Sequence, residues 1–181
     1  MSRSLKSLML SCFILGGALP LIVATSAATK AASNADENKA IVRRAVEVYN
    51  TGNVDLLDEL IAADAVGHEG PPTPPGPATV KQFITMARSA FPDLHVNIED
   101  MVAEGDRVAV LLTIRGTQKG AFMGIPATGK SVNFNAMDIY RIANGKIAEN
   151  WSVADNLGMP QQLGVVSAPS LEQVPVATQS K

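Results

Sequence analysis

The first part of the chain has apolar residues at the spacing of amphipathic helices. Asn34 followed by Glu37 has the spacing of a capping box, which predicts a helix from about residue 36 to residue 50. The apolar positions on one face of that helix are Ile41, Ala45, Val48 and Tyr49. Thr51-Gly52-Asn53 ends it, and Asn53 can cap a second, shorter helix. The apolar face of the second helix consists of Leu57, Leu60 and Ile61.

A proline-rich segment separates these helices from a third one. Residues 67–77 contain prolines at positions 71, 72, 74, 75 and 77. Proline fixes φ and lacks a backbone donor, so this segment is predicted to be a loop. Helical spacing then returns and ends before Pro92, because the residue before a proline avoids the helical region. The apolar face of this third helix consists of Val80, Phe83, Ile84, Ala87, Ala90 and Phe91.

From Leu94 onward the apolar period changes to two, which is the period of strands. Four strands are predicted, at about residues 94–99, 107–115, 131–142 and 146–155. Glu104-Gly105-Asp106 is the first turn, and Asn144-Gly145 is a strong two-residue hairpin signal. Residues 116–129 form a glycine-rich excursion, and residues 165–181 have no periodicity and are predicted to be a flexible tail.

Three helices followed by strands predict the α+β class rather than alternating βαβ units. We expect three N-terminal helices to pack on one face of a curved antiparallel sheet, in a domain spanning residues 36–164. The predicted core consists of Ile41, Ala45, Val48, Phe83, Ile84, Ala87, Val108, Val110, Leu112 and Ile139.

Residues 1–27 have the organisation of a secretory signal peptide. Arg3 and Lys6 precede an almost uncharged apolar stretch, and small residues follow it. A transmembrane anchor is the alternative, because residues 7–29 approach the roughly 20 apolar residues that a span needs. Gly16, Gly17 and Pro20 interrupt the stretch and favour cleavage, between Ser26 and Ala32. We therefore expect an exported protein, periplasmic or secreted and free of the membrane after signal removal, with a linker over residues 28–35.

Cysteine content and charge exclude several classes of chemistry. Cys12 is the only cysteine, so removal of the signal would leave no disulfide and no thiol nucleophile. Loss of Arg3 and Lys6 lowers the basic count from 15 to 13 against 17 acidic residues, a net charge of about −4. With no basic run, a nucleic-acid partner is disfavoured. Two histidines without a zinc-ligand spacing predict no metal site.

Residues 124–131 match the phosphate-binding pattern GxxxxGK[ST]. That loop binds phosphate because a helix follows it and directs its N–H groups at the anion. Here the strand-like Val132-Asn133-Phe134-Asn135 follows, and Pro126 removes one backbone donor. The segment is therefore interpreted as a connector between strands.

The Asn144-Gly145 turn predicts which hairpin residues share a face. If Ala143 faces Lys146, positions whose numbers sum to 289 pair, and side chains alternate with period two. The predicted pairs on one face are Tyr140 with Glu149, Asp138 with Trp151, Ala136 with Val153, and Phe134 with Asp155. A carboxyl group among aromatic side chains has a raised pKa, which suits proton transfer. The alternative is that Asp155 only ends the strand and caps the next turn, and spacing alone does not separate the two.

Several motifs, taken together, are typical of one family. They are Phe91-Pro92-Asp93-Leu94, Ala103-Glu104-Gly105-Asp106, Gly116-Thr117, the GIPATGK segment at 124–130, Gly145-Lys146-Ile147, Trp151-Ser152-Val153-Ala154-Asp155 and Gln161-Gln162-Leu163-Gly164. From about residue 38 to residue 164, the chain resembles the SnoaL-like polyketide (ester) cyclases of the nuclear transport factor 2-like superfamily. The resemblance implies an α+β cone with a pocket inside the curved sheet. It also implies a homodimer formed through the outer face of the sheet.

The resemblance also implies roles for individual residues. Asp155 matches the general acid/base of an intramolecular aldol cyclisation that uses no metal or cofactor. His68, just before the proline loop, matches a histidine of the family, although a lone histidine is more often structural. We therefore predict Asp155 and His68 as catalytic. The predicted contacts of a small apolar or carbonyl-containing molecule are Tyr49, Phe134, Asp138 and Trp151.

Two other functions stay open at this point. The protein could bind an apolar small molecule without turning it over, or it could activate water like the epoxide hydrolases of the same superfamily. A contact between Asp138 and Asp155 inside the cavity would favour the hydrolase. An apolar cavity with Asp155 pointing outward would favour binding alone.

Overall fold

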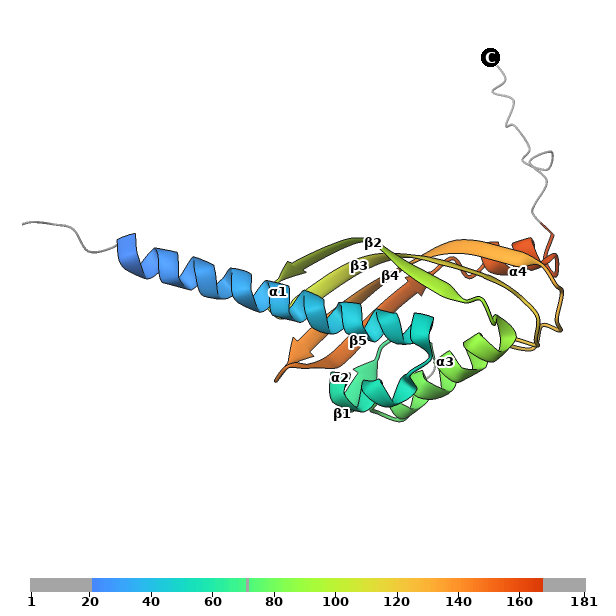
Figure 1. The fold of residues 1–181 in the computed structure, drawn as a ribbon, viewed down its shortest axis with the longest axis horizontal. Helices are drawn as coiled ribbons and strands as arrows, with labels where there is room; N and C mark the ends of the chain where they lie inside the picture. The colour runs from blue at the N-terminus through green and yellow to red at the C-terminus, as the bar shows by residue number, and fades with distance from the viewer. Residues whose placement is uncertain (1–20, 71, 168–181) are drawn as a thin grey trace, which may run out of the picture.

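The structure is a computed structural model that describes residues 21–70 and 72–167, with residues 21–33 described by their backbone course alone (Figure 1). The helices are α1 (Leu21–Thr51), α2 (Leu57–Leu60), α3 (Ala78–Ala90) and α4 (Gly158–Leu163), and a 3₁₀ turn, η1 (Val54–Leu56), precedes α2. The strands are β1 (Ile61–Gly67), β2 (His95–Glu104), β3 (Arg107–Thr117), β4 (Ser131–Ala143) and β5 (Lys146–Ala154). The α+β class is confirmed.

The five strands form one sheet in the order β1-β5-β4-β3-β2. Strands β2 to β5 are antiparallel neighbours, as predicted, but β1 pairs with β5 in parallel. The prediction of an entirely antiparallel sheet was therefore wrong, and Ile61 belongs to a strand rather than to the second helix. Ile61 and Ala65 of β1 are buried, so burial against β5 fixes a strand that local periodicity does not reveal.

Helix α1 crosses the sheet along β2 and β3, and α3 lies near the C-terminal end of α1 (Figure 1). Most predicted core residues are buried between these layers, namely Ala45, Val48, Ile84, Ala87, Val108, Val110 and Leu112, and Ile41 packs partly buried against them. Two predictions were wrong. Ile139 is 37% exposed because it lies on the sheet face away from the helices, and Phe83 is 41% exposed because it borders a cavity.

Helix α1 begins well before its predicted start. It is continuous from Leu21 to Thr51, so the capping-box pair Asn34 and Glu37 lies inside it. The predicted linker over residues 28–35 is therefore helical. Residues 1–20 of the predicted signal peptide and residues 168–181 of the predicted tail lie outside the described residues, and export stays a prediction. None of the described helices is both long and apolar enough to cross a membrane.

The glycine-rich excursion before β4 is organised by a buried glutamine. The Gln118 side chain donates to the Ile125 carbonyl at 3.2 Å and accepts from the backbone N–H and hydroxyl of Thr128 at 3.2 and 2.7 Å. These bonds satisfy the polar atoms of a side chain with no solvent exposure. Because β4 rather than a helix follows, the GxxxxGK[ST] match is a connector, as predicted.

Candidate functional site

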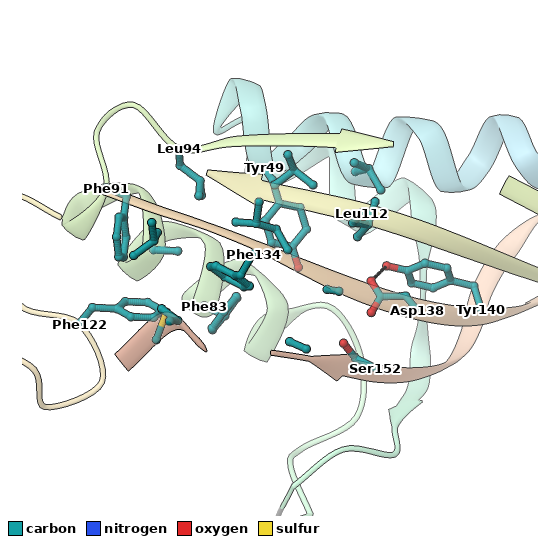
Figure 2. A pocket seen from close by; sticks show the side chains of 18 residues that line it. Tyr49, Phe83, Phe91, Leu94, Leu112, Phe122, Phe134, Asp138, Tyr140 and Ser152 are labelled. Carbon is teal, nitrogen blue, oxygen red and sulfur yellow. Dashed lines mark hydrogen bonds between the residues drawn. The ribbon is translucent and has the colours of Figure 1, made fainter. Parts of the chain in front are cut away.

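A cavity of about 170 Å³ lies between the sheet and helices α1 and α3. We call it the inner lobe. Its wall is mainly apolar and rich in aromatic rings, and Figure 2 shows these side chains projecting from several elements toward one space. Prominent among them are Phe83, Phe91, Leu94, Leu112, Phe122 and Phe134. An apolar space of this size fits an apolar group.

The oxygen-bearing side chains of the inner lobe are Tyr49, Asp138, Tyr140 and Ser152. Asp138 and Tyr140 are two residues apart on β4, so they share a face, and Ser152 stands opposite Asp138 on β5. In Figure 2 these three lie toward one side of the cavity, and Phe91 and Phe122 lie toward the other. The cavity therefore has an aromatic end and a polar end.

Asp138 is the buried carboxyl group of this polar end, with 8% of the residue exposed. Its Oδ2 accepts a hydrogen bond from the Tyr140 hydroxyl at 2.8 Å (Figure 2). Its Oδ1 is buried, and no group in the described part of the chain hydrogen-bonds to it. Ser152 lies close enough to favour the ionised carboxylate, but its hydroxyl does not reach hydrogen-bonding geometry with Oδ1. A buried carboxylate oxygen without a partner is costly, so this environment disfavours the ionised form of Asp138.

Burial sets the protonation behaviour of this group of side chains. Desolvation raises the pKa of the Asp138 carboxyl above its ordinary value, although the Ser152 and Tyr140 hydroxyls act in the opposite direction. Burial and the nearby Asp138 charge raise the pKa of both tyrosines, Tyr49 and Tyr140, well above their ordinary range. Both phenols therefore stay protonated and can donate hydrogen bonds, while Asp138 can exchange a proton closer to neutral pH than an exposed aspartate.

A sequence model of SnoaL-like polyketide cyclases matches residues 39–163. The chain belongs to the SnoaL-like polyketide cyclase family. Aklanonic acid methyl ester cyclase DauD from Streptomyces sp. (strain C5) is 33% identical over 131 residues, which cover 68% of this chain and 80% of DauD. Aklanonic acid methyl ester cyclase DnrD from Streptomyces peucetius is 32% identical over 128 residues, covering 68% and 88%.

Solved structures share the fold of this chain. TsrD from Streptomyces laurentii has a TM-score of 0.68 at 28% identity, over 72% of this chain and 97% of TsrD. A SnoaL-like polyketide cyclase from Agrobacterium tumefaciens str. C58 has a TM-score of 0.60 at 26% identity, over 70% of this chain and 98% of that protein. The family resemblance seen in the motifs is thereby confirmed.

In this SnoaL-like chain the hairpin register differs from the predicted one. Ile142 pairs with Ile147, as predicted, but Arg141 then pairs with Glu149, so Ala148 is an extra residue in β5. Such a bulge shifts every later pair by one, and Asp138 faces Ser152 instead of Trp151. Because side chains alternate, the shift reverses the face of each following residue on β5. The prediction that Trp151, Glu149, Val153 and Asp155 share the face of Asp138 was therefore wrong.

The predicted contact residues are divided between the two faces of the sheet. Tyr49, Phe134 and Asp138 line the inner lobe, as the prediction requires of ligand contacts. Trp151 pairs with the partly exposed Ile139 on the opposite face and does not line the cavity. Ser152, which sequence reasoning did not select, takes its place. Only knowledge of the bulge at Ala148 would have identified it.

His68 and Trp151 belong to a cluster on the outer face of the sheet. Their rings stack with centroids 4.4 Å apart and planes 4° from parallel. His68 Nε2 lies 2.8 Å from Glu149 Oε2, and the Arg107 guanidinium lies 5.0 Å from the centre of the Trp151 ring. His68 and Arg141 together lower the pKa of the Glu149 carboxyl. The structure therefore does not bring His68 to the cavity with Asp138.

Asp155 is exposed and closes a turn before α4. Its Oδ1 accepts the backbone N–H of Gly158 at 2.7 Å. Oxygen acceptors of this kind satisfy the free N–H groups at the start of a helix. Asp155 is not among the residues that line the inner lobe, so its geometry agrees with the capping alternative.

A second cavity of about 530 Å³ adjoins the inner lobe, and we call it the outer lobe. It lies under β1 and the proline loop, and Glu69, Asn150 and Val80 contribute to its wall. Within the described residues, no group of three or more His, Cys, Asp or Glu side chains could hold a metal ion. The acidic and hydroxyl side chains that line the inner lobe are Tyr49, Asp138, Tyr140 and Ser152, and Glu69 lines the outer lobe.

Proposed function

We propose that this chain catalyses proton transfer at a carbon next to a carbonyl group of an apolar small molecule, as a cyclase of the aldol type, without a cofactor. The observation that supports this most directly is the Asp138 carboxyl group, buried at the polar end of the inner lobe with Oδ1 unpaired. Relatives named aklanonic acid methyl ester cyclase and nogalonic acid methyl ester cyclase support a ring-closing reaction on a methyl ester.

In the proposed reaction, the Asp138 carboxylate takes a proton from the carbon next to the carbonyl group, and the C–H electrons form an enolate. A base performs this step when it lies within about 3 Å of the proton. The Tyr49 hydroxyl, which faces the same space from α1, donates a hydrogen bond to the developing enolate oxygen. The enolate carbon then attacks a second carbonyl carbon of the same molecule, and protonated Asp138 returns its proton to the new alkoxide.

We assign the acid/base role to Asp138 rather than to Asp155 because Asp155 already accepts the Gly158 N–H and lies outside the cavity lining. His68 has no role in this proposal either, because its ring stacks on Trp151 at the outer face of the sheet. Tyr49 remains the proposed donor for the substrate oxygen, and Phe134 provides an apolar surface beside it.

Binding without turnover is the second candidate. An apolar cavity with Asp155 pointing away from it favours binding over a hydrolase built on two acids in contact, because Asp138 and Asp155 do not meet. In this candidate, Asp138 and Tyr140 would accept and donate hydrogen bonds to a polar group of the ligand.

Hydrogen–deuterium exchange of a model ketone separates these candidates. Dibenzyl ketone in D₂O carries exchangeable hydrogens on both sides of a central carbonyl group, and mass spectrometry follows their replacement. We expect the wild-type protein to accelerate exchange, and Asp138→Asn to reduce the rate by about 10²–10⁴-fold, the usual worth of a positioned base. The ketone should still bind, because the substitution preserves shape.

Asp155→Asn is the matched control, because it also converts one aspartate to its amide, and it should exchange the ketone at the wild-type rate. Equal rates in the wild type and Asp138→Asn would refute the role of Asp138. Tight binding of the ketone with no accelerated exchange in the wild type would instead select binding without turnover.

A further inference from the structure

The inner and outer lobes share one boundary, and the boundary carries the reactive groups. The residues that line both lobes are Tyr49, Phe83, Asp138, Tyr140 and Ser152. Every oxygen-bearing side chain of the inner lobe is in this set. Asp138 is thus at the boundary between the two lobes, which we call the waist, rather than at the bottom of one pocket.

The two lobes differ in size and character. The inner lobe holds about 170 Å³, and an apolar cavity of about 150 Å³ is large enough to bind benzene. One aromatic ring therefore fills it. The outer lobe holds about 530 Å³, three times as much, so it takes a larger group.

The wall of the outer lobe is built by segments that are fixed to each other. The backbone N–H of Gly76 donates to the Ala65 carbonyl at 2.9 Å and joins the proline loop to β1. Gly76 has a φ of +88°, and a Cβ there would lie 2.6 Å from the Ala63 carbonyl oxygen, so only glycine allows this close approach. The proline loop is therefore held against β1, which fixes the position of this part of the wall of the outer lobe.

The charges around both lobes have one sign. Asp138 and Glu69 are the ionisable acids that line them, and no lysine, arginine or histidine is among their described lining residues. An anionic group placed in either lobe would meet like charge without a cationic partner, which is unfavourable away from water. The lobes are suited to uncharged groups.

We propose that the ligand of this site is a neutral two-part carbonyl compound, with a single ring in the inner lobe, a larger group in the outer lobe, and the carbonyl group between them at the waist. This rests on the proposed function in taking Asp138 as the group that meets the carbonyl region. Each part contributes binding by burying apolar surface in its own lobe.

Dissociation constants of three ketones, measured by isothermal titration calorimetry with the wild-type protein, test the proposal. Dibenzyl ketone has one ring for each lobe, and phenylacetone has one ring in all. We expect dibenzyl ketone to bind at least tenfold more tightly, and its analogue with a carboxylate on each ring to bind at least tenfold more weakly than dibenzyl ketone. Equal affinity for the one-ring and two-ring ketones would overturn the two-part assignment. Equal affinity for the carboxylate analogue would overturn neutrality.

Filling each lobe separately identifies where the rings lie. Ala136→Leu fills the inner lobe alone, and Ala65→Leu fills the outer lobe alone. In each variant, dibenzyl ketone should lose its advantage over phenylacetone. An advantage that survives both substitutions would contradict the proposal. Circular dichroism and melting establish folding, and if one variant does not fold, the wild-type comparison and the other variant still decide.

Binding and exchange can fail independently, so the two proposals are distinguishable. If dibenzyl ketone binds in two parts but its exchange is not accelerated, the catalytic role of Asp138 fails and the ligand assignment stands. If phenylacetone exchanges through Asp138 but binds as tightly as dibenzyl ketone, the reverse holds.

Discussion

The hydrogen bond between Tyr140 and Asp138 allows us to predict how much the pKa of Asp138 changes when the donor is removed. The Tyr140 hydroxyl donates to Asp138 Oδ2 at 2.8 Å, and it favours the ionised carboxylate. Tyr140→Phe removes the donor and keeps the ring. The pKa of Asp138 must then rise further, because desolvation by burial, its largest cause, is left less opposed.

The size of this pKa change follows from the free energy of the hydrogen bond. A hydrogen bond to a charged group is worth about 1.5–3 kcal/mol, and about 1.36 kcal/mol corresponds to a tenfold change in a protonation equilibrium. We therefore expect the proton affinity of Asp138 to increase by about 10- to 100-fold. A base with higher proton affinity loses its active, ionised form at higher pH, so the acid limb of the exchange rate should move to higher pH.

Two measurements check this. Carbon-13 NMR of the labelled Asp138 carboxyl follows its titration directly, and the pH dependence of dibenzyl ketone exchange follows it through the reaction. Tyr49→Phe is the matched control. It also removes one phenol from the cavity wall, but not the one that donates to Asp138, so it should lower the exchange rate while the acid limb moves much less. An acid limb and a carboxyl titration that stay in place in Tyr140→Phe would refute the reasoning.

Three further predictions concern stability and placement. Burial raises the Asp138 pKa, so the folded chain holds this proton to higher pH than the unfolded chain, and stability is lost as pH rises through the folded pKa. In urea unfolding near pH 8, Asp138→Asn should therefore be more stable than the wild type by about 1–3 kcal/mol. This gain in stability should shrink toward pH 4. Asp155→Ala should lose about 0.5–2 kcal/mol by removing the acceptor of the Gly158 N–H, and Asp155→Asn should retain most of it; equal losses in calorimetry would count against the turn role. Trp151→Phe should leave the dissociation constant of dibenzyl ketone within twofold of the wild type, and a tenfold weakening would show that the outer face contributes to binding.

The apolar periodicity of the sequence correctly predicted those helices and strands whose formation depends mainly on neighbouring residues. The alternation from Leu94 onward and the Asn144-Gly145 turn identified four strands, and helical spacing located the third helix. Strand β1 was missed because only a distant partner stabilises it. Ile61 pairs with Ile147, and the buried positions Ile61 and Ala65 are four residues apart, a spacing that fits a helix face as well as a strand.

The residues of the candidate site were predicted correctly where the periodicity of one element determines its face, and wrongly where the face depends on strand pairing. Tyr49, Phe134 and Asp138 lie on elements whose faces are set by their own periodicity, and all three line the cavity. Trp151 was assigned to the wrong face because the pairing of β4 with β5 was counted from the turn without the extra residue Ala148. A bulge has no sequence signature here, and a single inserted residue is enough to invert the result.

The bulge at Ala148 also has a consequence for how this site can change over generations. The register across the bulge decides whether β5 presents Ser152 and Asn150 to the lobes, or Trp151 and Glu149 instead. Because the extra residue is Ala148 itself, loss of its codon would remove the bulge without moving any later pair. Arg141 would still pair with Glu149, and Asp138 would still face Ser152. The β5 strand can therefore lose its bulge in one genetic step, while Asn150 and Ser152 keep facing the lobes and the sheet keeps its strand order.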